Sequence, residues 1–224
     1  MIKKFEKTIS VNGKNTKIFF WLEDEYGLNL EQATQICLLA EKYLERYPCI
    51  HVNEICDYCY MDYGENEYAV DYFWDDENIE YESRDDLARY FWDDKIIGFN
   101  HIRCHSLEYD DLELKKGNTP WNVSGDITQI KRYERRKTIK TLFIHELGHA
   151  IENQLKIYED AEMIKLYETC SNGRFADIHE FIAECFVVFE YFPLNGVVLD
   201  VMTIVSKYVR KAQRGGELDG ERKI

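Results

Sequence analysis

Hydrophobic and β-branched residues gather in short runs between polar turns over the first half of the chain. The runs KKFEKTISV and TKIFFWLE flank Asn12-Gly13, a dipeptide typical of a tight hairpin turn. Later runs of the same character are CIHVNEIC, EYAVDYFW and part of IIGFNHIRCHSLEY. We therefore predict a hairpin at the beginning of the chain and further strands that join it in a sheet.

Between Asn29 and about Arg46 the hydrophobic positions instead follow the helical period. Asn29 and Gln32 have the spacing of a capping box, and Pro48 lies just beyond the expected end. This pattern predicts a helix on which the sheet packs. A second, short helix is expected after Ser83, within a polar and acidic stretch.

The rest of the chain is predominantly helical in pattern, and the turn residues Asn118-Thr119-Pro120 and Ser124-Gly125-Asp126 mark its beginning. A C-cap signal at Asn172-Gly173 and a stop at Pro193 help to divide it. We predict helices over Thr141–Asn153, Glu159–Cys170, Asp177–Phe192 and Val197–Gln213.

The first of these helices carries the motif His145-Glu146-x-x-His149. Residues four apart lie on one face of a helix, so both imidazoles can reach one metal ion. Glu146 points about 100° away from His145, where it can hold a water molecule rather than bind the ion. Two nitrogen ligands beside a general base are what a zinc peptidase requires.

The surroundings of the motif favour a metal site over a histidine pair in the core. On the helical wheel His145 and His149 lie roughly opposite the hydrophobic stripe, which consists of Ile139, Phe143, Leu147, Ala150 and Ile151. Gly148 lies between them, and a residue without a side chain is compatible with the close approach of another element. An ordinary solvated helix face is the alternative.

A third ligand is expected on the helix that begins at Asp177, because catalytic zinc usually has three protein ligands and one open position. This helix is hydrophobic nearly all round, yet Glu180 and Glu184 lie one turn apart on one of its faces. A buried carboxylate needs a compensating partner. Either glutamate can be the ligand while the other orients a histidine; we favour Glu180, and His179 is a weaker candidate.

HELGHA followed by EFIAE resembles the gluzincin zinc metallopeptidases, most closely the catalytic domains of anthrax-toxin lethal factor and the Pro-Pro endopeptidases. The resemblance covers roughly residues 138–192. It implies a zincin-like fold, one catalytic zinc ion and Glu180 as its third ligand. A second resemblance is to the ImmA/IrrE-like peptidases, which act in the cytoplasm.

One position departs from the gluzincin pattern. That family has a tyrosine about seven residues before the ligand glutamate, where it stabilises the oxyanion, whereas this chain has Gly173 there. Tyr158, Tyr167 or His179 takes over this role, or the contribution is missing. The departure keeps open a zinc-binding regulatory protein without turnover and a zinc hydrolase of non-peptide substrates.

Composition limits the partners and the compartment. The net charge of −14 disfavours binding to nucleic acid, and no hydrophobic run approaches the roughly 20 residues that span a bilayer. The first residues have no hydrophobic run after their basic residues, so we expect no secretory signal there. Seven cysteines without such a signal suggest reduced thiols in the cytoplasm. Export by a route without an amino-terminal signal stays open.

A second, structural zinc site is an alternative for some of these cysteines. Cys56 and Cys59, together with Cys104 and either His101 or His105, have suitable donor types. CDYC lacks the turn residues usual in zinc knuckles, and cysteines on strands more often behave as small hydrophobic residues. We therefore expect that this second site does not form.

Together these patterns predict an α+β zinc endopeptidase that forms a single domain over residues 1–224. A sheet-containing lobe, 1–126, is expected to meet a helical lobe, 127–224, with the metal between them. His145, His149 and Glu180 would hold zinc, Glu146 would act as general base, and a protein or peptide substrate would dock along an edge strand of the sheet.

Overall fold

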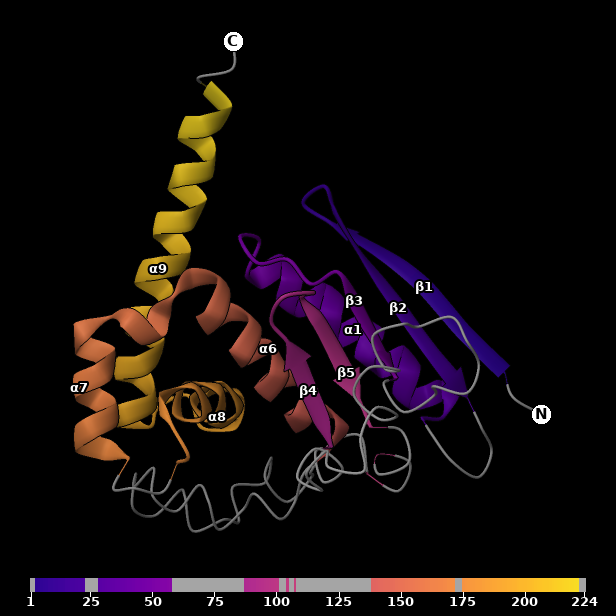
Figure 1. The fold of residues 1–224 in the computed structure, drawn as a ribbon, viewed down its shortest axis with the longest axis horizontal. Coiled ribbons are helices and arrows are strands. Elements are labelled where there is room, and N and C mark those ends of the chain that lie inside the picture. The colour runs from indigo at the N-terminus through magenta and orange to yellow at the C-terminus, as the bar shows by residue number, and fades with distance from the viewer. Residues whose placement is uncertain are drawn as a thin grey trace, which may run out of the picture.

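Five strands form one mixed sheet in the part of the chain that the computed structural model describes, residues 3–22, 28–57, 87–100, 104, 107, 138–171 and 175–221 (Figure 1). The strands are β1 (Lys3–Val11), β2 (Lys14–Leu22), β3 (Glu54–Asp57), β4 (Ala88–Phe91) and β5 (Ile96–Phe99). Their order is β1-β2-β3-β5-β4. The inner pairs β2–β3 and β3–β5 are parallel, whereas β1–β2 and β4–β5 are antiparallel. β4 is therefore an edge strand that runs against its neighbour.

The predicted hairpin at the beginning of the chain is confirmed. β1 and β2 pair from Lys3↔Leu22 to Val11↔Lys14, and only Asn12 and Gly13 separate them. Both turn residues have positive φ, 53° and 74°, which is the conformation that Asn-Gly adopts in a two-residue hairpin turn. The short turn sets the register of the two strands.

Five α-helices and one 3-10 turn account for the remaining described elements. They are α1 (Leu30–Arg46), α6 (Ile139–Leu155), η3 (Ile157–Glu159), α7 (Ala161–Cys170), α8 (Ile178–Tyr191) and α9 (Gly196–Glu221). Asn29 and Gln32 form the predicted capping box, and the Asp177 side chain accepts from the backbone N–H of Glu180 at the beginning of α8. The predicted α+β class is confirmed.

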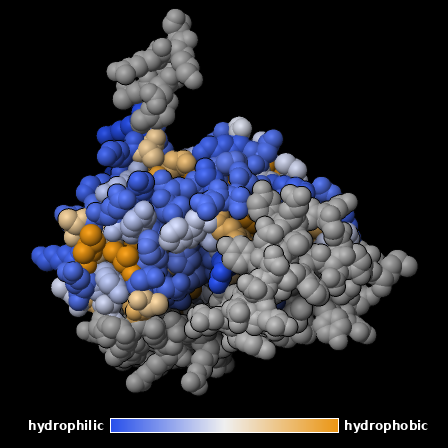
Figure 2. Space-filling view, in the orientation of Figure 1, coloured by the Kyte–Doolittle hydropathy of each residue, from blue (hydrophilic) through white to orange (hydrophobic). Residues whose placement is uncertain are grey.

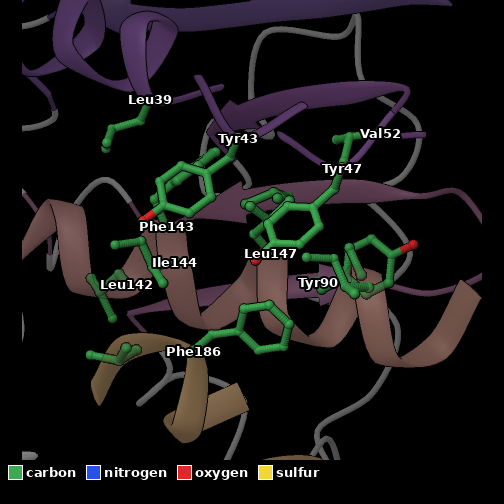
Figure 3. Packing of buried hydrophobic residues seen from close by; sticks show 14 of the residues in the cluster. Leu39, Tyr43, Tyr47, Val52, Tyr90, Leu142, Phe143, Ile144, Leu147 and Phe186 are labelled. Carbon is green, nitrogen blue, oxygen red and sulfur yellow. The ribbon is translucent and has the colours of Figure 1, made fainter. Parts of the chain in front are cut away.

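An aromatic layer joins the sheet-bearing part of the chain to the helical part (Figure 3). Tyr43 of α1 packs against Phe143 of α6, with 6.4 Å between ring centroids. Tyr47 packs against Phe186 of α8 at 6.0 Å. Helix α6 thus contacts α1, β4 and α8, and it is buried along most of its length.

Two of the three cysteines considered for a structural zinc site, Cys56 and Cys104, lie in different hydrophobic clusters. Cys56 belongs to a small cluster with Phe19 and Ile96, whereas Cys104 lies in the main core and donates its thiol to the carbonyl of Leu87 at 3.0 Å. Cys59, His101 and His105 lie outside the described residues. Cys56 and Cys104 are buried core residues, and our expectation about the second zinc site as a whole stays a prediction because its other residues are not described.

Some predicted boundaries were wrong. A strand, β4, occupies Ala88–Phe91, where the short helix predicted after Ser83 would have continued; pairing with β5 overrides the weak local preference of this run. Helix α9 extends to Glu221 rather than ending near Gln213, since glycine lowers helix propensity without blocking the backbone hydrogen bonds.

Several predictions lie outside the described residues. These are the strand EYAVDYFW, the turns at 118–120 and 124–126, and the cap at 172–173.

The described surface is mostly hydrophilic on the face drawn in Figure 2. Within the described residues, no single helix has the length and hydrophobicity needed to cross a membrane. Only α8 and α9 considered together reach that threshold, and the chain bends by 109° between them.

Candidate metal centre

Helix α6 begins one residue after a reciprocal cap. The Thr138 hydroxyl accepts from the backbone N–H of Thr141, and the Thr141 hydroxyl accepts from the backbone N–H of Thr138. The helix ends at Leu155, and Lys156 beyond it has a left-handed conformation with φ of 53°. The motif is therefore held in the central turns, away from both helix ends.

Helix α8 crosses α6 closely at Gly148. A Cβ atom built on this glycine would lie 2.9 Å from the Cα of Ala183 and 3.1 Å from Cδ2 of Phe186. Such contacts are shorter than a packed core accepts. The missing side chain lets the first two turns of α8 lie beside the histidines, as the sequence suggested.

Three side chains converge at this crossing. Nε2 of His149 is 3.1 Å from Nε2 of His145. Glu180 places one carboxylate oxygen 3.5 Å from His145 Nε2 and the other 3.4 Å from His149 Nε2. A tetrahedral ion bound at about 2.0–2.1 Å spaces its ligand atoms about 3.3 Å apart, so the three donors match this requirement.

The donor triangle of His145, His149 and Glu180 is open on one side. The two histidine side chains are 16% and 11% exposed, whereas that of Glu180 is 43% exposed. Among the described residues, this is the one group of three or more donors within reach of a common ion. The exposed side leaves room for a further ligand beside Glu180.

Carboxylates also lie behind the donor triangle. Glu184 places Oε1 3.5 Å from Nδ1 of His145, so it faces the nitrogen that is turned away from the triangle. Glu152, which is fully buried, lies on the corresponding side of His149. Carboxylates at these positions orient metal-binding imidazoles and set which nitrogen carries the proton.

Glu146 is buried against the edge strand β4. Its carboxylate accepts the backbone N–H of Tyr90, and its side chain lies close enough to both histidines to interact with their charge. Burial raises the pKa of Glu146, and the two histidines oppose this effect. Helix α6 thus places the carboxylate of Glu146 beside the donor triangle and beside β4.

A second contact fixes β4 to α6. The Gln154 side chain donates to the Tyr90 hydroxyl at 3.1 Å and to the backbone carbonyl of His51 at 2.7 Å. It also accepts from the backbone N–H of His51 at 3.0 Å. The edge strand therefore has a defined position along the helix that carries the motif.

The charges around the donors favour a cation. Interactions with His145 and His149 hold the pKa of Glu180 well below its usual range. Burial lowers the pKa of His149, but the carboxylates of Glu152 and Glu180 outweigh this and raise it to about 9. For His145 burial is likewise outweighed, by Glu180 and Glu184, so its pKa is raised well above the ordinary value. Four carboxylates around two imidazoles create a site in which positive charge is stabilised.

The three residues considered as substitutes for the oxyanion-stabilising tyrosine lie in different surroundings. Tyr167 packs against Phe181, 5.8 Å between ring centroids, in the contact between α7 and α8. Tyr158 packs instead against His179, whose ring centroid is 4.7 Å away. His179 Nδ1 donates to Glu152 Oε1 at 2.9 Å. Tyr158 and His179 therefore lie together near α6, whereas Tyr167 does not join them.

Sequence reasoning overlooked Glu152 and the amide of Tyr90. A signal for Glu152 was present, because it follows His149 by three positions and residues at this spacing are neighbours on a helix. No local signal marks the Tyr90 amide, since that contact depends on how β4 packs against α6.

The residues fit a divalent metal ion of the kind that imidazole and carboxylate ligands hold together. Two imidazole nitrogens and one carboxylate meet at ligand spacing, and a carboxylate lies behind each histidine. Comparisons with protein-family models, with curated proteins and with solved structures gave no match to this chain.

Proposed function

We propose that the protein is a zinc-dependent endopeptidase of the gluzincin type with a zincin-like arrangement of sheet and helices. The observation that carries the proposal is the donor triangle of His145, His149 and Glu180 with the carboxylate of Glu146 beside it. A metal site with three protein donors and one open side is typical of catalysis, whereas structural zinc sites usually have four protein ligands.

Zinc is the metal that fits the donors best. Two imidazoles and one carboxylate in a nearly tetrahedral arrangement suit Zn²⁺, while Mg²⁺ and Ca²⁺ prefer six or more oxygen ligands. When bound, zinc would polarise the substrate carbonyl and make an adjacent water molecule more acidic.

Glu146 supplies the proton transfers. Its carboxylate takes a proton from the attacking water as the oxygen forms its bond to the peptide carbonyl carbon. It then passes that proton to the leaving nitrogen as the carbon–nitrogen bond breaks. Burial raises the pKa of this carboxylate, which makes it a better proton acceptor than an exposed glutamate.

The substrate would lie along β4. In the described part of the sheet this strand pairs with β5 alone, and the Tyr90 amide points to Glu146 rather than into the β4–β5 pair. An extended peptide that adds to this edge would place its backbone next to Glu146 and the donor triangle. Backbone pairing of this kind accepts many sequences, so pockets for individual side chains would set the preference.

A digest of a peptide library tests the proposal. We expect the purified protein to cleave peptides, to lose this activity on chelation and to regain it with Zn²⁺. The His149→Ala variant is the matched control and should stay inactive after Zn²⁺ is added. Stoichiometric zinc without cleavage would favour a binding protein, and hydrolysis of small esters or amides but not of peptides would favour another hydrolase. Either result would contradict the endopeptidase proposal.

A further inference from the structure

Glu152 is a buried carboxylate that the proposed reaction does not use. It lies in the last turns of α6, three residues after His149, and it is 0% exposed. An unpaired carboxylate in this position is costly, so its partners need an explanation. One of them is His179, and the oxygen that His179 contacts, Oε1, is also the one that faces His149 across the turn of α6.

The contact with His179 crosses from α6 to the beginning of α8. His179 Nδ1 donates to Glu152 Oε1 at 2.9 Å, and the residue that follows it is the donor Glu180. The His179 ring has aromatic neighbours, with centroid distances of 4.7 Å to Tyr158 and 5.2 Å to Trp92. Trp92 comes directly after β4, so this ring cluster lies between the edge strand and α8.

The contact with His149 is longer than a hydrogen bond. Nδ1 of His149 is 3.9 Å from Glu152 Oε1. Both Nδ1 of His149 and the second oxygen of Glu152, Oε2, are buried without a hydrogen-bond partner among the described residues. A buried polar atom without a partner is destabilising, and these two atoms are a donor and an acceptor on neighbouring side chains.

We propose that Glu152 is a positioning residue. Its carboxylate orients the metal donor His149, and His179 in turn holds that carboxylate in place. Acceptance of the His149 Nδ1 proton by Glu152 leaves the lone pair on Nε2, the atom that faces the donor triangle. The bond from His179 fixes the carboxylate for this role. The inference rests on the zinc site of the proposed function.

The two halves of this arrangement can be separated by substitution. Glu152→Gln removes the charge with little change of shape. His179→Phe keeps a ring between Trp92 and Tyr158 but removes the Nδ1 donor, and His179→Asn restores an N–H near the Nδ1 position. Glu168→Gln, on an exposed position of α7, is the matched control for the loss of one negative charge.

Zinc affinity, measured by competition with a chromophoric chelator, is the first readout. We expect Glu152→Gln to weaken affinity by roughly 10–100-fold. His179→Phe should weaken zinc affinity by a smaller factor, and His179→Asn should have most of the wild-type affinity. Glu168→Gln should bind zinc as tightly as the wild type. The second readout is the visible absorption spectrum of the Co²⁺-substituted protein, which reports the arrangement of the ligands. It should change in Glu152→Gln and should stay as in the wild type in Glu168→Gln.

Wild-type affinity and an unchanged Co²⁺ spectrum in folded Glu152→Gln would overturn the inference and leave the proposed function intact. Equal losses in His179→Phe and His179→Asn would overturn the support role of His179. A wild-type protein that binds neither Zn²⁺ nor Co²⁺ would overturn the proposed function and the inference together.

Discussion

Glu180 and Glu184 lie one turn apart on α8 and yet face different atoms. Glu180 reaches Nε2 of both histidines, whereas Glu184 faces only Nδ1 of His145. The sequence left the choice between them open because both side chains project from one helix face. The structure separates them, since Glu180 in the first turn of α8 faces Nε2 of both histidines, whereas Glu184 one turn later faces Nδ1 of His145.

This difference predicts unequal effects on metal binding. Glu184→Ala should weaken zinc affinity by roughly 10–100-fold, because it removes the partner of one imidazole. Glu180→Ala should weaken it more, because it removes one of three donors. Isothermal titration with Zn²⁺ measures both. A larger loss in Glu184→Ala than in Glu180→Ala would show that the ligand assignment is reversed.

Three of the residues that sequence reasoning identified have relative positions that a single helix determines, whereas Glu180 on α8 was favoured through a resemblance between motifs. His145, Glu146 and His149 share one helix, and their relation follows from its period alone. The Tyr90 amide and the His179–Glu152 contact depend on the packing of β4 and α8 against α6. Nothing in the local sequence specifies that packing, so these contacts could not be predicted.

At the scale of elements, the site depends on the close crossing of α6 and α8. Gly148→Ala should destabilise the protein, although alanine is the better helix former by about 1 kcal/mol. The added Cβ meets the Cα of Ala183 and the ring of Phe186, and overpacking of this kind typically costs about 1–3 kcal/mol. Separation of the helices should also lower zinc affinity.

Urea unfolding and zinc titration test this prediction together. Gly196→Ala is the matched control, because its added Cβ would meet no atom within 4 Å. We expect this control to retain both stability and zinc affinity. A Gly148→Ala variant that is as stable as the wild type and binds zinc equally well would contradict the role assigned to the crossing.

A polar network also joins the elements. Glu190 of α8 accepts from the Tyr43 hydroxyl of α1 at 2.5 Å and lies 3.2 Å from the ammonium groups of both Lys42 and Lys140. Burial alone would raise the pKa of Glu190, but Tyr43 and the two lysines lower it below the ordinary 4.5. A carboxyl with a lowered folded-state pKa stabilises the protein above its unfolded pKa, and this stabilisation is lost as pH falls through the folded pKa.

Glu190→Gln should therefore lower the free energy of unfolding at pH 7 by roughly 1–3 kcal/mol. The difference from the wild type should shrink as pH falls below the ordinary value of 4.5. Urea unfolding at several pH values measures it, with Glu45→Gln on the exposed face of α1 as control. A difference that is constant with pH would show that the charge of Glu190 is not responsible.

Most helices and the hairpin could be predicted because their signals are local. Asn12-Gly13 sets the hairpin, and Asn29, Asp177 and Pro193 set helix ends. β4 was mistaken for a helical region because its four residues gain their structure from pairing with β5. The parallel neighbours β2, β3 and β5 are likewise joined by contacts between distant segments, so the strand order could not be read from the sequence.

At the scale of the whole molecule, a bound metal would connect two helices that are far apart in sequence. His145 and His149 lie on α6 and Glu180 on α8, so binding stabilises the folded chain and not the unfolded one. At a free zinc concentration 1,000 times the Kd this amounts to about 4 kcal/mol, or roughly 8–16 °C in Tm for a chain of this size.

Chelation should therefore lower the melting temperature of the wild-type protein. His149→Ala should start from the lower value and should not respond to the chelator, because its site is already incomplete. Differential scanning calorimetry with and without chelator measures both effects. An unchanged wild-type melting curve after verified metal loss would contradict a site that links α6 and α8.

The measurement that tests the central claim most directly is the hydrolysis rate of Glu146→Gln per zinc-loaded chain, relative to the wild type. The amide cannot accept the proton of the attacking water, while the donor triangle is unchanged. We predict equal zinc content, about one ion per chain, and a rate lower by about 10²–10⁴-fold. A zinc-loaded Glu146→Gln variant that hydrolyses peptides at the wild-type rate would contradict the proposed mechanism.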